Sequence, residues 1–143
     1  DAIIGVLYEV ISGPAGEERD WNRFRSLFLP EGRLIPTGRT EAGAHFHRVL
    51  SPDEWIEGAE PFFEQNGFFE REIARATEEF GKVAHAFSTY ESRYIAEDLE
   101  PFQRGINSIQ LLHDGTRWWV ATVLWMGETP EHPIPAVYLP ASP

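Results

Sequence analysis

The sequence predicts an α+β fold, in which helices cover one face of a curved antiparallel sheet. Two observations carry this prediction. Apolar residues recur at helical spacing in the first third of the chain, and from Gly67 onward they alternate with a period of two. Short turns join the alternating segments, because Asp114-Gly115 is a strong hairpin signal and Glu79-Phe80-Gly81 makes another tight connection.

Two helices are predicted before residue 30. The first covers residues 1–12 and ends at Gly13-Pro14. Its apolar face consists of Ile3, Ile4, Leu7, Tyr8 and Ile11. The second begins after Asp20, a residue type that caps helix N-termini well, and ends at Pro30.

The third helix has the clearest start in the chain. Ser51 is an N-cap, Pro52 occupies the first helical position, and Glu54 completes a capping box. Pro61 is expected to kink or end this helix, because proline lacks the amide hydrogen that helix interiors use.

Strands follow the two predicted N-terminal helices. Two short strands are expected at residues 33–36 and 44–50, and four long ones at about 68–79, 82–96, 101–113 and 116–127. Residues 1–127 are therefore predicted to form a single domain. Residues 128–143 contain five prolines, which exclude a helix or a central strand. This tail is expected to be an extended arm packed on a surface, or else disordered.

Composition excludes several classes of function. The 143-residue chain has no cysteine, so disulfides, thiolate metal sites and cysteine catalysis are excluded. Its net charge of −11 repels phosphate backbones, which argues against nucleic-acid binding. No run approaches the roughly 18 apolar residues of a membrane helix. No phosphate-binding loop is present, so no nucleotide cofactor is expected. These features favour a cytoplasmic protein.

The chain resembles the nuclear transport factor 2-like superfamily, also called SnoaL-like or cystatin-like. The resemblance rests on "FLPEGRLIP" after the second helix, the capped third helix, "FGKVAHAF", and above all "LLHDGTRWWVATVLW". It implies a cone with an internal ligand pocket between sheet and helices, and pairing of sheets in a homodimer. Members include isomerases, dehydratases, cyclases and non-catalytic assembly domains, and none of their catalytic sets matches this sequence residue by residue.

Both faces of the predicted sheet are apolar, so both are expected to be covered, one by helices and the other by a second subunit. The resemblance implies that Trp118 faces the cone interior, and alternation then places Ser108, Gln110 and Thr122 inward as well. The expected pocket lining is Tyr8, Trp21, Phe24, Trp55, Ser88, Ser108, Gln110, Trp118 and Thr122. The expected dimer interface is Phe87, Ile109, Leu111, Trp119 and Val123.

The segment "VAHAFSTYESR" supplies the candidate chemistry. We favour the phase that turns Ala84, Ala86, Ser88, Tyr90 and Ser92 inward, because small residues leave room for a cavity. In this hypothesis the Tyr90 hydroxyl donates to a developing oxyanion and Arg104 holds a carboxylate. The alternative for Arg104 is a structural ion pair near the mouth with Glu91, Asp98 or Glu100.

The reversed phase would change the mechanism. It would place His85 in the pocket as a general base, oriented by Glu91 or Glu72. The alternative is a histidine at an interface or satisfied within the core. His45 and His47 could join His85 in a metal site, but no helical histidine spacing or fixed acid supports this, and no metal is expected.

The resulting prediction is a protein that binds a small, mostly apolar molecule. If it is an enzyme, cofactor-free acid–base chemistry of the isomerase, dehydratase or cyclase type fits best. The alternative is a non-catalytic ligand-binding or dimeric assembly module. A titratable group inside the cavity would favour the enzyme.

Overall fold

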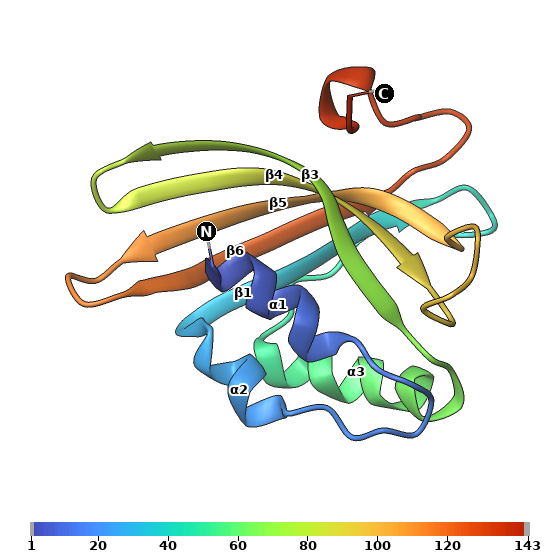
Figure 1. Cartoon of the computed structure of the whole chain (residues 1–143), viewed down its shortest axis with the longest axis horizontal. Helices are drawn as coiled ribbons and strands as arrows, with labels where there is room; N and C mark the ends of the chain where they lie inside the picture. Colours follow the sequence, from blue (N-terminus) through green and yellow to red (C-terminus); the bar gives the residue numbers. More distant parts are fainter. Residues whose placement is uncertain (1, 142–143) are drawn as a thin grey trace.

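A computed structural model describes residues 2–141. Six strands form one curved sheet in the order β2-β1-β6-β5-β4-β3, with three helices against its concave face (Figure 1). The helices are α1 (Ala2–Ile11), α2 (Trp21–Ser26) and α3 (Pro52–Gln65). The strands are β1 (Phe28–Arg39), β2 (His45–His47), β3 (Phe69–Phe80), β4 (Val83–Arg93), β5 (Gln103–His113) and β6 (Trp118–Gly127). The predicted α+β architecture is confirmed, and no helix within residues 2–141 is long and apolar enough to cross a membrane.

Strand β1 differs from the prediction. It is 12 residues long rather than short, and it runs parallel to β6, whereas the other neighbouring strands are antiparallel. Its register shifts between Phe28 and Arg33, and Pro30 lies in this irregular stretch. Proline is tolerated there because a bulge does not require its missing amide hydrogen.

The helices supply most of the packing against the concave face. Ile4 and Leu7 of α1, Phe24 of α2 and Ile56 of α3 are buried against the sheet. The predicted capping box of α3 is present, since Ser51 Oγ accepts from the Glu54 amide at 3.1 Å and Glu54 Oε1 accepts from the Ser51 amide at 2.8 Å. Pro61 does not end this helix, which continues to Gln65.

A buried arginine fixes the connection between α1 and α2. Arg19 donates to the carbonyl oxygens of Ile11, Gly13, Pro14 and Glu17 at 2.7–3.2 Å. Its guanidinium also lies 4.4 Å from the ring centre of Phe63 in α3. These contacts use the planar donor fork that distinguishes arginine from lysine.

A β-bulge in β6 overturns the predicted phase of that strand. Leu111 pairs with Val120, but Gln110 pairs with Thr122, so Ala121 is the extra residue. Trp118 and Val120 face the helices as expected, but beyond the bulge Val123 and Trp125 take that side. Thr122 and Leu124 therefore lie on the outer face.

The predicted faces of β5 were also wrong, because they were inferred from the unbulged phase of β6. Ile109, Leu111 and Val123 are at most 4% exposed in the core and cannot belong to an outer dimer interface. Ser108 and Gln110 alternate with them and lie on the outer face. Of the predicted interface, Phe87 and Trp119 remain on that face.

The C-terminal arm crosses the outer face of the sheet, opposite the helices, and contains a short 3₁₀ helix, η1 (Ala136–Tyr138) (Figure 1). Thr89 Oγ1 donates to the Tyr138 carbonyl at 2.6 Å, and the ring centres of Phe87 and Tyr138 lie 5.3 Å apart. Ile134 is buried. The arm thus covers part of the surface on which a partner subunit was expected.

Candidate ligand pocket

A cavity of about 200 Å³ lies between the helices and the concave face of the sheet. Its apolar wall is formed by Leu7, Ile11, Phe24, Leu34, Trp55, Phe68, Val123 and Trp125. Polar groups from α1 and from strands β3, β4 and β5 form the rest of the wall, namely Tyr8, Glu70, Tyr90, Ser92, Gln103 and Asn107. A mostly apolar cavity with a few convergent polar groups is typical of a small-molecule site.

Glu70 carries the one carboxyl among the described residues that line the cavity. It lies near the start of β3, where its amide donates to Ser12 Oγ at 3.0 Å and ties the strand to the end of α1. Ser92 Oγ donates to the Glu70 carboxylate at 3.0 Å. Burial raises the pKa of Glu70 to about 7, although Ser92 and Asn107 oppose the shift. Both protonation states are therefore accessible near neutral pH.

Tyr90 contributes a free hydroxyl. It is opposite Gly105 in the pairing of β4 with β5, and its ring occupies space that a side chain at position 105 would fill. Among residues 2–141 its hydroxyl has no hydrogen-bond partner, although the residue is only 4% exposed. Burial, and next the charge of Glu70, raise the pKa of Tyr90. The hydroxyl thus keeps its proton and can donate it to a ligand.

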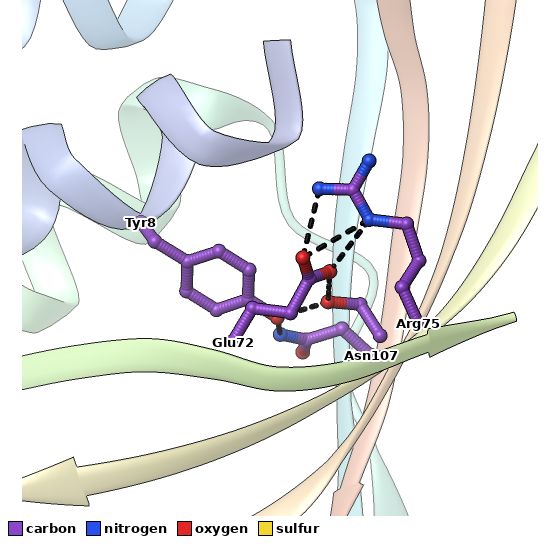
Figure 2. Close-up of polar contacts among 5 residues, drawn as sticks. Tyr8, Glu72, Arg75 and Asn107 are labelled. Atoms are coloured by element: carbon purple, nitrogen blue, oxygen red, sulfur yellow. Dashed lines mark hydrogen bonds and ion pairs between the residues drawn. The ribbon is translucent and has the colours of Figure 1, made fainter. Parts of the chain in front are cut away.

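Tyr8 belongs to a hydrogen-bonded chain that crosses from the cavity to β3 (Figure 2). Asn107 Nδ2 donates to the Tyr8 hydroxyl at 2.9 Å, and that hydroxyl lies 2.6 Å from Ser88 Oγ. Ser88 donates in turn to the Glu72 carboxylate, which is ion-paired with Arg75 at 2.8 Å. The chain holds the Tyr8 ring at the cavity wall.

Comparison with known proteins finds similarity in structure alone, because no family model and no curated protein match the sequence. A cystatin-like protein of unknown function from Nostoc punctiforme is 11% identical, with a TM-score of 0.67 over 90% of this chain and 88% of that one. A nuclear transport factor 2-like protein of unknown function from Shewanella baltica is 15% identical, with a TM-score of 0.53 over 90% and 92%. A candidate ketosteroid isomerase from Kribbella flavida is 13% identical, with a TM-score of 0.50 over 99% and 88%.

These similarities decide the fold. The chain has the nuclear transport factor 2-like fold. At such low identities the match shows architecture and says nothing of activity, so the site must be argued from its own residues.

Two of the three predicted catalytic residues lie outside the cavity of this nuclear transport factor 2-like fold. Arg104 faces the other side of the sheet, where it donates to both oxygens of Glu128 at 3.0 and 3.2 Å. Its partner therefore belongs to the C-terminal arm, not to the predicted set of Glu91, Asp98 and Glu100. His85 lies on the same outer face, with its side chain 56% exposed and 2.9 Å from Glu78. Alternation along β4 separates His85 from Tyr90, because residues five apart point to opposite faces.

The predicted pocket residues divide into three groups. Tyr8, Phe24 and Trp55 line the cavity. Trp21 and Ser88 are buried directly behind them, and Trp118 is half-buried at 5.1 Å from the His113 ring. Ser108, Gln110 and Thr122 lie on the outer face because of the β6 bulge. His45 and His47 are exposed on β2, and no group of three potential ligands among residues 2–141 could hold a metal ion.

Sequence reasoning missed Glu70 and Asn107, and a second bulge explains the first omission. Counting from the turn that joins β3 to β4, Ala74 pairs with Thr89 but Glu72 pairs with Tyr90, so Ile73 is an extra residue in β3. This shift turns Glu70 toward the cavity, beside Ser92. The only signal in the sequence was the predicted inward position of Ser92, whose partner could not be found without knowing of the bulge.

Proposed function

We propose that this protein binds a small, mostly apolar molecule in the cavity and that Glu70 acts on it as an acid or base without a cofactor. The observation that carries the proposal is a half-buried carboxyl whose pKa is raised to about 7, next to the free hydroxyl of Tyr90. General bases are most effective when their pKa lies near the working pH.

The two groups have complementary roles in this proposal. Ionised Glu70 removes a proton from the ligand, and Tyr90 donates a hydrogen bond to the oxygen on which negative charge develops. The returning proton comes from the same Glu70 carboxyl. Isomerisation, dehydration and cyclisation can all proceed through such a proton transfer.

The cavity limits the size of the ligand. Its volume is about 200 Å³. An apolar cavity of about 150 Å³ suffices to hold benzene, and drug-sized ligands need roughly 300–1,000 Å³. A monocyclic or short-chain molecule is therefore favoured. The similarity in fold to a candidate ketosteroid isomerase supports a ligand-binding cone, but a steroid exceeds this cavity.

The proposal is tested by identifying a molecule that copurifies with the protein, using native mass spectrometry, and by measuring its binding to variants. Glu70→Gln should abolish turnover, and Tyr90→Phe should reduce turnover by about 10²-fold or more. Exposed Glu60→Gln and Tyr94→Phe, which lie outside the cavity lining, are the matched controls. Unchanged turnover in both cavity variants would refute the assignment.

A second candidate function is assembly, for which the outer face of the sheet provides a reason. Phe87, Leu124 and Met126 border the arm there but remain 39–41% exposed. We propose that this surface pairs with a second copy of the chain. Leu124→Glu should then convert a dimer into a folded monomer in sedimentation velocity. A wild-type monomer at micromolar concentration would exclude the homodimer.

A further inference from the structure

The cavity wall carries an unbalanced set of charges and rings. Of its lining residues, six are aromatic, one is acidic, and none is lysine, arginine or histidine. The aromatic residues are Tyr8, Phe24, Trp55, Phe68, Tyr90 and Trp125. Aromatic faces attract cations, and a carboxylate placed among them pairs with one. An anionic ligand would meet no countercharge on this wall.

The hydrogen-bonded chain behind Tyr8 makes the wall still richer in acceptors. The Glu72 carboxylate, paired with Arg75, can only accept a hydrogen bond, so the single proton of Ser88 must point to it. Ser88 Oγ must then accept the proton of Tyr8. The Tyr8 oxygen accepts in turn from Asn107. The ion pair at one end thus directs every proton of the chain away from the cavity.

Ser92 and Asn107 follow the same pattern. The proton of Ser92 is donated to Glu70. Asn107 uses its amide hydrogens on Tyr8 and toward Glu70. Two acceptors therefore face a ligand from neighbouring elements, the Glu70 carboxylate and the Tyr8 oxygen. Tyr90 retains the one free hydroxyl proton among the described residues that line the cavity.

We infer that the ligand is a small primary or secondary amine, bound as its ammonium ion between the Glu70 carboxylate, the Tyr8 oxygen and the surrounding rings. This inference rests on the proposed function and specifies the class of molecule that the cavity takes. A buried ammonium is costly unless it is paired and hydrogen-bonded, and this wall provides both. The net charge of −11 also favours the approach of cations.

The preference depends on the charge of Glu70, and several groups face that residue. Tyr8 of α1, Tyr90 and Ser92 of β4, and Asn107 of β5 face it in the cavity. On its outer side it borders a surface groove with Glu9 of α1, Arg71 of β3, Arg93 of β4 and Asp98 of the following loop. Of these, the burial of the carboxyl dominates its titration, so the amine preference should weaken as the pH falls from 8 to 6.

Three probes of matched shape test the inference by calorimetry at pH 8: benzylamine, benzyl alcohol and benzoate. Each fits a cavity of this volume, and they differ in charge. Benzylamine should bind at least 10-fold more tightly than benzyl alcohol, and benzoate more weakly than both. Glu70→Gln should remove the preference for benzylamine while benzyl alcohol still binds.

The role of the hydrogen-bonded chain has its own variants. Glu72→Gln and Ser88→Ala each release the Tyr8 proton toward the cavity, so benzylamine affinity should fall several-fold more than benzyl alcohol affinity. Two variants are used because loss of either side chain could affect folding, which circular dichroism would reveal. If benzyl alcohol binds and benzylamine binds no better, the amine inference is wrong and the cavity proposal stands. If none of the three probes binds, both are wrong.

Discussion

The hydroxyl of Tyr90 occupies the space that a side chain on Gly105 would need. A Cβ at position 105 would overlap this hydroxyl and would lie 2.5 Å from the carbonyl oxygen of Met126. Since the two residues are directly paired across β4 and β5, the cavity position of Tyr90 depends on glycine at the neighbouring strand.

Gly105→Ala should therefore destabilise the protein and displace Tyr90. The Met126 carbonyl belongs to the backbone and cannot turn aside, so a cost of about 1–3 kcal/mol is expected, as for other overpacked sites. Urea unfolding measures it. The control is Gly58→Ala in α3, where nothing lies within 4 Å of the new methyl group and a gain of up to about 1 kcal/mol is expected. Equal effects of the two substitutions would contradict this account.

Glu70 should make stability depend on pH in an unusual direction. Its pKa in the folded state, about 7, lies above its ordinary value of 4.5, so the folded state holds the proton more tightly. The free energy of unfolding should thus fall as the pH rises from about 4.5 to 7, by up to about 3 kcal/mol from this residue. Comparing wild type with Glu70→Gln between pH 5 and 8 isolates the effect. Parallel profiles would argue against a raised pKa of Glu70.

Glu91 should make the free energy of unfolding depend on pH in the opposite sense. It is 8% exposed on the outer face and lies 2.6 Å from both Arg71 and Arg93. Burial alone would raise its pKa, but the hydrogen bonds from Arg93 and Arg71 outweigh burial and lower the pKa. Its contribution to the free energy of unfolding is present above the pKa of the unfolded state and is lost as the pH falls through the pKa of the folded state.

Replacement of this residue, Glu91→Gln, should cost about 2 kcal/mol at pH 7, less than a fully buried pair because Arg71 is largely exposed. The cost should shrink toward zero at pH 3. Exposed Glu79→Gln serves as the control for thermal and denaturant unfolding. A cost that did not vary with pH would show that packing, not charge, explains the effect.

Arg19→Lys should destabilise the turn between α1 and α2. A single ammonium cannot reach the four carbonyl oxygens that the guanidinium contacts, so we expect a loss of about 2 kcal/mol. Arg25→Lys, at an exposed ion pair with Asp53, should change stability by less than about 0.5 kcal/mol. Similar losses at both sites would rule out this role for Arg19.

Local patterns predicted most of the fold. The capping box at Ser51 lies within four residues, and alternation along the β4 segment lies within one strand, so both could be inferred from neighbours in sequence. The length of strand β1 was underestimated because Pro30 is typical of a break. The strand tolerates this proline only because of a bulge opposite β6.

The site was only partly predictable, because it depends on registers between strands. Alternation within β4 alone puts Tyr90 on the same face of the sheet as Ser88, as predicted. The faces on which Glu70 and Val123 lie depend on the bulges at Ile73 and Ala121. Each bulge inserts one residue, so every side chain beyond it, counted from the hairpin turn, points to the opposite face of the sheet. Neither position has a glycine or another local signal of a bulge.

The most direct test of the account is a carbon NMR titration of the Glu70 side-chain carboxyl, assigned by comparison with Glu70→Gln. We predict a midpoint near pH 7 in the free protein and a lower midpoint when benzylamine is bound, because a cation favours the ionised carboxyl. A midpoint near the ordinary glutamate value of 4.5, unchanged by benzylamine, would contradict the central claim that this carboxyl is the ionisable group of a ligand cavity.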